Sequence, residues 1–337
     1  MPTIKVIKWI AYVLVSLGAA GIFLFYVLIV AGKAPMLQEL WVTTAMTTLN
    51  HKWLATAFID TQTINNIMAR TYVDDSLYAT DLSGTPASPS AGQFDYTAEG
   101  YTQLDRSLYK KEVSGDLWRG YILLLSDPSR LTLAQTNQQG VAGQTVMEMT
   151  QQVGGVAGIN GGGFSDGVNF NGTGGIVAGI LIVEGQIISP ADPNSQEIFN
   201  IIGMTDAGKL VLMYGTAAEA LSVGVRNAVS FPPFLIVNGE GLISGTGGWG
   251  IAPRTAIGQR ATGEILFLVI DGRQIGHSVG VDIGVLQEVL LEEQCVNAAM
   301  MDGGSSTVMV YNNEYVNKPS LGYERAINNC WVIKPST

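Results

Sequence analysis

The chain has 337 residues, of which 47% are hydrophobic, 14% are charged and 41 are Gly. This composition supplies a sizeable core and excludes a chain that is disordered over most of its length. The formal charge is −10, from 28 acidic and 18 basic residues. No cluster of Lys and Arg alternates with aromatic residues, so nucleic acid is excluded as a partner.

The first element is an uncharged stretch over residues 9–32, between Lys8 and Lys33. As a helix that rises about 1.5 Å per residue it would span roughly 36 Å, which covers a hydrocarbon core of about 30 Å. Lys5, Lys8 and the α-amino group precede it and only Lys33 follows closely, so the positive-inside rule places residues 1–8 in the cytoplasm. The sequence predicts a single transmembrane helix in contact with membrane lipid and an extracytoplasmic remainder.

A cleaved signal peptide is the alternative for this stretch. Such a peptide has an apolar run of about 7–15 residues before a small-residue cleavage site. Here the run is longer, and the small residues Ala19, Ala20 and Gly21 lie inside it. We therefore favour a retained anchor.

Residues 33–80 are predicted to form a juxtamembrane amphipathic helical region. Between Met36 and Phe58 apolar residues recur at helical spacing, namely Leu37, Trp41, Ala45, Leu49, Trp53 and Phe58. Residues 81–100 contain Ser-Gly-Thr-Pro-Ala-Ser-Pro-Ser-Ala-Gly and lack apolar periodicity, which indicates a linker. The compact domain is then expected to begin near Gly100 and to occupy residues 101–337.

Within residues 101–337, short apolar runs alternate with turns and a few helical patterns. Strands are predicted over residues 121–126, 210–214, 265–270 and 296–301, and helices over 143–153 and 281–294. Hairpins are predicted over 176–188, turning at Glu184-Gly185, and over 307–317, turning at Asn312-Asn313. The sum predicts an α/β protein of the mixed α+β kind, with one globular domain, a mixed β-sheet, hairpins and flanking helices.

Residues 158–167 form a glycine-rich cluster, Gly-Ile-Asn-Gly-Gly-Gly-Phe-Ser-Asp-Gly. Glycines allow a tight turn in which several N–H groups face an anion, here at Gly161, Gly162 and Gly163. Asn160 and Asp166 add polar side chains. Three consecutive glycines by themselves are more typical of a plain turn between strands.

Asp302 directly follows the strand predicted over residues 296–301, where its carboxylate can point into a crevice. An Asx turn or a cap is the alternative. Arg254 and Arg273 are unusual in a chain so poor in charge, and a guanidinium suits bidentate binding of a phosphate. A structural ion pair with Asp271 or Asp302 is equally compatible with the sequence.

Cysteine and histidine give little indication of chemistry. Cys295 and Cys330 fit either one disulfide or a pair of buried free thiols. His51 and His277 are the only histidines, so the sequence contains no zinc-type Cys/His constellation.

In this order, the clusters resemble the phosphodiester glycosidase family, whose bacterial members are often described as exopolysaccharide-related. The similar segments are 159–164, 179–185, 254–258, 271–273, 278–280 and 302–306, followed by Arg325 before the final strand. Together they cover roughly the whole region from Gly100 onward. Two positions depart from the family pattern, which often has Gly at Ser305 and an apolar or hydroxyl residue at Asp282.

The resemblance implies hydrolysis of a sugar 1-phosphodiester at the anomeric carbon, through an oxocarbenium-like transition state. Such a site needs cationic and N–H donors for the phosphate, a role that would fall to Arg254, Arg273 and the backbone of residues 161–163. It also needs a carboxylate for the sugar cation or the attacking water. Asp302 is the first choice for that role and Asp271 the second.

Three further residues would position sugar hydroxyls or phosphate oxygens in this reading: Asn160, Ser305 and Ser306. No metal site is assigned, although a divalent cation held by Asp302 and neighbouring carbonyls stays open. The expected function is therefore a membrane-anchored, extracytoplasmic hydrolase of sugar 1-phosphodiester linkages in cell-surface glycans or polysaccharides.

Two other functions are compatible with the sequence. A serine hydrolase would use Ser305 or Ser306 with His277, but neither serine lies in a Gly-x-Ser-x-Gly elbow. A non-catalytic glycan-binding or scaffold protein of exopolysaccharide biosynthesis would have the same anchor and linker.

Overall fold

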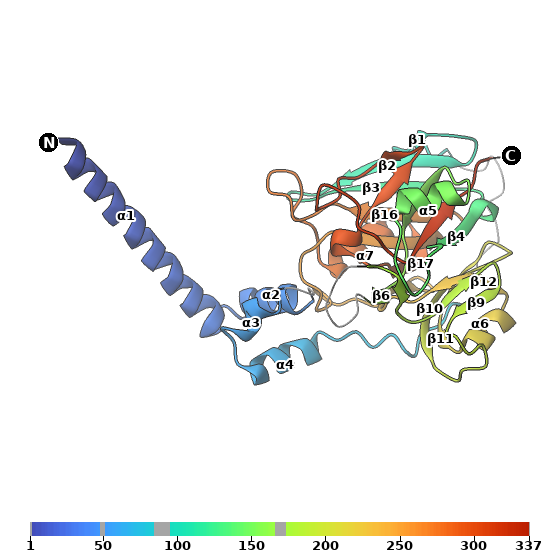
Figure 1. Cartoon of the computed structure of the whole chain (residues 1–337), viewed down its shortest axis with the longest axis horizontal. Coiled ribbons are helices and arrows are strands. Elements are labelled where there is room, and N and C mark those ends of the chain that lie inside the picture. The colour runs from blue at the N-terminus through green and yellow to red at the C-terminus, as the bar shows by residue number, and fades with distance from the viewer. Residues whose placement is uncertain (1, 48–50, 84–94, 166–172, 337) are drawn as a thin grey trace. The chain divides into compact units, whose positions relative to one another are not determined.

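The computed structural model describes residues 2–47, 51–83, 95–165 and 173–336. By internal contacts the chain divides into two compact units, shown with all elements in Figure 1. The first comprises Met1–Tyr72 with Gly248–Gly250, and the second comprises Val73–Gly247 with Ile251–Thr337.

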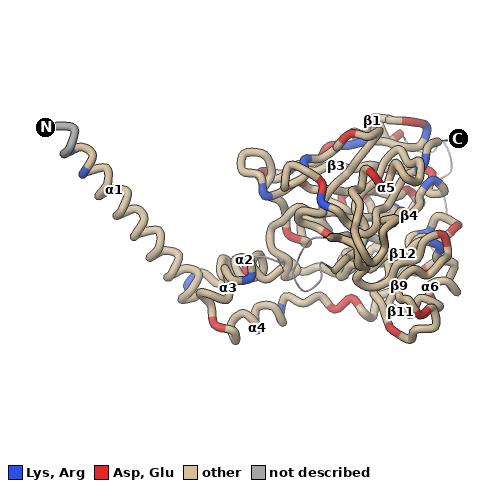
Figure 2. Tube along the Cα trace, viewed as in Figure 1, with Lys and Arg blue, Asp and Glu red and all other residues tan. Residues whose placement is uncertain are grey.

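The first unit begins with the predicted apolar helix. Helix α1 spans Pro2–Phe25 and continues as the π-helical segment η1, Tyr26–Val30. Within the described residues, Lys5–Val30 is the one helical stretch long and apolar enough to cross a membrane, and its most apolar window is only 6% buried. Figure 2 shows that the helix carries no charged residue beyond its N-terminal end. The length and composition match those predicted for a membrane span.

The helical region that follows is broken into three short helices, so the single helix predicted between Met36 and Phe58 is wrong. Helix α2 spans Pro35–Met46, α3 spans Trp53–Thr56 and α4 spans Thr61–Arg70. Their buried apolar side chains come from all three helices: Val42, Ala45, Ala55, Ile64 and Ile67. Trp53 and Phe58, predicted on the apolar face, are 57% and 45% exposed, and Leu49 lies outside the described residues.

The second unit is built from antiparallel sheets. The largest, with eight strands, has the order β1 (Thr102–Gln103), β2 (Leu108–Ser114), β3 (Arg119–Leu125), β16 (Ile265–Ile270), β15 (Arg254–Arg260), β17 (Cys295–Met300), β13 (Phe234–Val237) and β14 (Glu240–Gly241). A five-stranded sheet has the order β11 (Leu210–Gly215), β10 (Phe199–Thr205), β12 (Val225–Val229), β8 (Leu181–Val183) and β9 (Gln186–Ser189).

A second five-stranded sheet has the order β19 (Glu314–Tyr315), β18 (Met309–Tyr311), β5 (Ala157–Asn160), β20 (Asn329–Ile333) and β4 (Leu131–Gln135), and β6 (Phe164–Ser165) pairs with β7 (Ile176–Val177). Every pairing described between these strands is antiparallel. The mixed α+β class is confirmed, and several antiparallel sheets take the place of the one mixed sheet expected.

The main core contains side chains from all three larger sheets, including Ile159 and Trp331, Ile257 and Phe267, and Ile202 and Leu212. Strand β16 lies between β3 and β15, and each of its residues is buried. Its continuous apolar run is therefore explained by burial on both faces.

Three helices and two turns follow the local sequence signals. Helices α5 (Val146–Gln152) and α6 (Ala217–Ser222) each start at a capping box, formed by Thr145 and Thr216. Helix α7 (Ile283–Glu292) starts at Asp282, whose carboxylate accepts a hydrogen bond from an N–H of the first turn. The predicted turns at Glu184-Gly185 and Asn312-Asn313 are confirmed, with φ between 48° and 79° at all four residues.

The compact unit begins at Val73, well before the boundary predicted near Gly100. Asp75 is 1% exposed, and its carboxylate accepts from the Tyr214 hydroxyl at 2.7 Å and from the Phe234 N–H at 2.6 Å. Residues 84–94 of the predicted linker lie outside the described residues. Residues that precede the supposed linker are thus an integral part of the folded unit.

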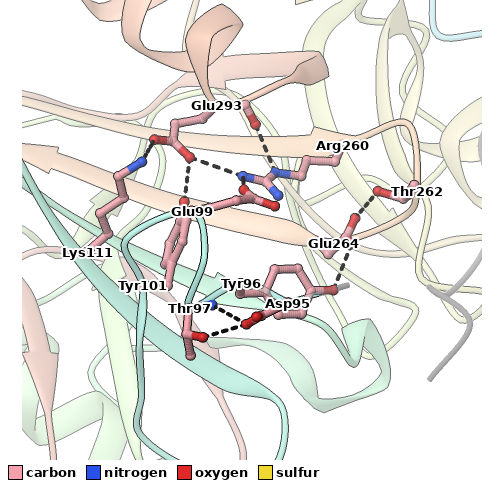
Figure 3. Close-up of polar contacts among 10 residues, drawn as sticks. All are labelled: Asp95, Tyr96, Thr97, Glu99, Tyr101, Lys111, Arg260, Thr262, Glu264 and Glu293. Carbon is pink, nitrogen blue, oxygen red and sulfur yellow. Dashed lines mark hydrogen bonds and ion pairs between the residues drawn. The ribbon is translucent and has the colours of Figure 1, made fainter. Parts of the chain in front are cut away.

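The end of the supposed linker, residues 95–101, is also fixed, by a buried ionic network (Figure 3). The Tyr101 hydroxyl donates to Glu293 at 2.6 Å, and Arg260 bonds to Glu293 at 3.1 Å and to Glu99 at 2.8 Å. Burial raises the pKa of Tyr101 above its usual range, so the hydroxyl stays protonated and can donate. We call residues 95–101 the strap.

Candidate active site

The strand register brings the predicted site loops to one edge of the eight-stranded sheet. Strand β15 is antiparallel to both of its neighbours, with Arg254 opposite Ile270 of β16 and Ala256 opposite Met300 of β17. The start of β15 therefore lies beside the ends of β16 and β17. Arg254 begins the first strand, and Asp271 and Asp302 follow the other two.

Two glycines allow the arginines to approach the turn after Asp302. A Cβ placed on Gly303 would lie 3.7 Å from Nη1 of Arg254, and one on Gly304 would lie 3.1 Å from Nη2 of Arg273. Gly304 has φ of 63°, a conformation that favours glycine. Both guanidinium groups therefore lie close to the backbone that directly follows Asp302.

Arg254 is held in the interior, with 4% of its surface exposed. Its Nε donates to the carbonyl of Val281 at 3.1 Å. Desolvation lowers the pKa of Arg254 to about 10. The attraction of Asp282 and Asp302 raises this pKa, whereas the repulsion of Arg273 lowers it. The guanidinium remains charged at neutral pH.

Arg273 is exposed as a whole residue, although its guanidinium end lies near Gly304. Desolvation lowers its pKa, and the attraction of Asp302 opposes that shift. Two guanidinium groups thus interact electrostatically with one carboxylate. Such an arrangement can hold an anionic group beside Asp302.

Asn160 holds the Asp302 loop in place. It is fully buried, its Nδ2 donates to the carbonyl of Asp302 at 2.5 Å, and its Oδ1 accepts from the Thr255 hydroxyl at 2.7 Å. The side chain therefore holds the backbone of Asp302, and its contact with sugar hydroxyls stays a prediction. Thr255 was missed by sequence reasoning, and its one signal is its place directly after Arg254.

The glycines at 161–163 provide close packing. Their N–H groups donate to the carbonyl and side chain of Asn329 and to the carbonyl of Ser230. A Cβ on Gly161 would lie 2.1 Å from Oδ1 of Asn329. Since these N–H groups already have acceptors within the protein, we do not assign them to a phosphate. Asp166 of the same cluster lies outside the described residues.

Asp271, the second carboxylate predicted for catalysis, contacts three neighbouring residues. It is fully buried. Its Oδ2 lies 2.8 Å from Nε2 of His277, and its Oδ1 accepts from Nδ2 of Asn317 and the N–H of Lys318, both at 3.0 Å. Asp302 is the candidate carboxylate because it interacts electrostatically with both Arg254 and Arg273. Among the described residues no hydrogen bond joins His277 to Ser305 or Ser306, as a serine hydrolase would require.

The hydroxyl-bearing residues after Asp302 lie in a tight turn. Ser305 and Ser306 belong to the 3-10 turn η3, Gly304–Ser306. The hydroxyl oxygens of Ser306 and Thr307 are buried and have no hydrogen-bond partner within the part of the chain that the structure describes. Buried hydroxyls without a partner are unusual in folded proteins, and these two atoms are too buried to be assigned to a ligand.

Neither metal nor disulfide chemistry is assigned to the site. Over residues 2–47, 51–83, 95–165 and 173–336, no group of three or more His, Cys, Asp or Glu side chains is placed to hold a metal ion. Cys295 in β17 and Cys330 in β20 are free and buried, which resolves the alternative that the sequence left open.

The fold and site define a β-rich domain that gathers two arginines and a carboxylate where three neighbouring strands begin or end. A family model described as phosphodiester glycosidase matches residues 154–334, a span that contains all of these residues. The chain belongs to the phosphodiester glycosidase family.

Relatives support this assignment at low identity. The chain is 26% identical over 239 residues to the SPbeta prophage-derived uncharacterized protein YomE of Bacillus subtilis, covering 69% of this chain and 34% of the relative. It is 26% identical over 165 residues to the N-acetylglucosamine-1-phosphodiester alpha-N-acetylglucosaminidase of Bos taurus, covering 49% and 27%. The chain thus spans about a third or less of the length of these relatives.

Solved structures show the same fold. The zebrafish N-acetylglucosamine-1-phosphodiester alpha-N-acetylglucosaminidase catalytic domain, auto-inhibited by its pro-peptide, gives a TM-score of 0.55 at 20% identity and covers 68% of this chain and 82% of that one. A hypothetical protein from Synechocystis gives 0.53 at 14% identity, covering 69% and 63%. At these identities the similarity establishes the fold alone.

Proposed function

We propose that the protein is a membrane-anchored, extracytoplasmic hydrolase of sugar 1-phosphodiester linkages in cell-surface glycans or polysaccharides. The observation that carries the proposal is the meeting of Arg254 and Arg273 with Asp302 inside the region matched by the family. The names of the mammalian relatives support the linkage type, a sugar 1-phosphodiester.

Each of these groups has a role in that reaction. Arg254 and Arg273 bind the phosphate and stabilise it as a leaving group, which reduces the need for a general acid. Asp302 stabilises the sugar cation or activates the attacking water. Ser305 orients phosphate or sugar oxygens, and Asn160 holds the Asp302 loop.

The anchor places this chemistry at a membrane. Helix α1 with η1 has the length and composition of a span, and Lys5 and Lys8 precede its apolar part. The positive-inside rule then favours a cytoplasmic N-terminus and an extracytoplasmic catalytic unit.

The test is hydrolysis of methyl phosphodiesters of sugar 1-phosphates in water enriched in heavy oxygen. Attack at the anomeric carbon transfers the label to the free sugar, whereas an ordinary phosphodiesterase transfers it to the phosphate. Label in the sugar supports the proposal, and label in the phosphate contradicts it. Glycan binding without turnover would support the scaffold alternative.

A further inference from the structure

A pocket of about 240 Å³ lies next to the candidate site. It is formed by residues 114–119, which join β2 to β3, and by residues 276–279 of the loop that follows β16. The Val279 N–H donates to the Leu117 carbonyl at 2.9 Å, and the Arg119 N–H donates to the Ser278 hydroxyl at 3.2 Å. The two walls are therefore fastened to each other, so the pocket is part of the folded structure.

The same loop links the pocket to the predicted phosphate-binding group. The Arg273 N–H donates to the carbonyl of Val279 at 3.1 Å, and Val279 lines the pocket. On its other side Arg273 approaches Gly304 in the turn after Asp302. The backbone of Arg273 is therefore bonded directly to a residue that lines the pocket.

The lining combines an aromatic ring with polar groups. Trp118 is partly buried and packs on Gly115, where an added Cβ would lie 2.4 Å from the indole Nε1. Asp116 supplies acceptors, Arg119 supplies donors, and the His277 ring is oriented by its 2.8 Å contact with Asp271. An apolar ring face with donors and acceptors around it matches a sugar ring, which has apolar faces and an equatorial rim of hydroxyls.

We propose that this pocket binds a further saccharide unit of the substrate. This unit is attached to the phosphate that Arg273 binds, on the side opposite the sugar bond that is hydrolysed. The volume is below the roughly 300–1,000 Å³ of pockets for drug-sized ligands, so it suits one ring. This inference rests on the proposed function for the linkage to the phosphate, but sugar binding in the pocket can be measured separately.

The kinetic test compares two substrates with the full chain in a detergent that has no sugar headgroup. One is a sugar 1-phosphodiester of methanol and the other carries lactose in place of the methyl group. We expect Trp118→Ala to raise KM for the lactose substrate about tenfold and to leave the methyl substrate within twofold. Gly115→Ala should do the same, because its Cβ displaces the indole. Trp53→Ala, at a tryptophan 57% exposed in the helical unit, is the matched control and should change neither.

An equal loss on both substrates, or no change on either, would overturn the proposal. Saturation-transfer NMR with lactose, cellobiose and chitobiose tests the pocket without turnover. A signal that is present in the wild type and lost in Trp118→Ala supports the pocket even where no phosphodiester is cleaved, in which case the proposed function fails alone. Hydrolysis without any such signal would overturn the pocket and leave the proposed function standing.

Discussion

At Arg254, a charge is kept in the interior although burial opposes it. The side chain is 4% exposed, and desolvation lowers its pKa to about 10 despite the attraction of Asp282 and Asp302. Groups held in this way are common where a site needs a charge, and removing them often leaves stability unharmed. Function and stability can therefore be separated at this residue.

We expect Arg254→Gln to abolish hydrolysis of a sugar phosphodiester while its melting temperature stays within about 4 °C of the wild type. An uncharged amide avoids the desolvation that the guanidinium suffers. Hydrolysis and thermal unfolding should be measured on the same preparation, with Asp302→Asn as the companion variant. A buried structural pair would instead lose about 3–5 kcal/mol when broken, so parallel loss of folding and activity would contradict the catalytic reading.

The pH profile gives a second test of Arg254. Its folded-state pKa is about 10, below the ordinary value, so the guanidinium loses its proton as the pH rises through that range. We expect phosphate inhibition to weaken between pH 9 and 11, on the order of one unit either side of this pKa. Inhibition that is flat up to pH 11 in a folded enzyme would show that the guanidinium stays protonated over this range.

At Glu324, outside the candidate site, the pH dependence of stability can be tested. This residue is 7% exposed, and desolvation raises its pKa although the N–H groups of Met147 and Val146 lower it. The folded chain then binds the proton of Glu324 more tightly than the unfolded chain. The protonated carboxyl therefore stabilises the fold fully at low pH, and this contribution is lost as the pH rises through the folded pKa. Glu324→Gln should melt above the wild type at pH 7 and match it near pH 4. A variant that melts lower at pH 7 would show that the carboxylate is stabilising.

Among the elements, the strap depends on charged groups with little exposure. The side chains of Arg260 and Glu293 are 5% and 7% exposed in their pair, and Lys111 also bonds to Glu293 at 2.6 Å. Arg260→Ala leaves Glu293 and Glu99 without this partner. We expect a loss of about 3–5 kcal/mol in the free energy of unfolding, measured by urea denaturation.

The matched control for the strap is Lys110→Ala. Lys110 pairs with Glu112 at 3.5 Å, with side-chain exposures of 34% and 69%, and such surface pairs contribute about 0–1 kcal/mol. Equal effects of the two substitutions would show that the buried network adds nothing to stability. Faster proteolysis within residues 95–101 should accompany only the Arg260 variant.

Elements with strong local signals were predictable, and the broken helical region was not. The turns at Glu184-Gly185 and Asn312-Asn313 need residues that tolerate positive φ, and such residues can be recognised in the sequence. The buried strand β16 needs a continuous apolar run, which can be recognised in the same way. Between Met36 and Phe58 the helical period is present, yet the buried set is chosen by packing among three short helices. Periodicity alone cannot show that a helix ends and restarts.

At the scale of the whole molecule, the fold requires residues before the predicted domain boundary. Asp75 accepts from Tyr214 and Phe234 in the interior of the second unit. A fragment of residues 73–337 should therefore be soluble and melt cooperatively. A fragment of residues 101–337 leaves the Phe234 N–H buried without this acceptor and should melt lower or aggregate. Equal melting of the two would show that residues 73–100 are dispensable.

Topology is the remaining whole-molecule prediction. With two lysines before the span and one closely after it, protease added to intact cells or spheroplasts should digest the second unit. Digestion only after lysis would reverse the orientation. A mature chain that begins after residue 32 would instead show that the helix is a cleaved signal.

The sequence by itself determined the apolar span, the α+β class, two hairpins and the ordered clusters that indicate a phosphodiester glycosidase, because each depends on composition or short spacing. Tertiary structure decided which cluster residues face the site. Asp271 and Asn160, for example, are held by hydrogen bonds from segments that are distant in the chain. Asp302 meets Arg254 only through the antiparallel register of β15 and β17. Contacts between residues so far apart in the chain leave no local pattern from which they could be predicted.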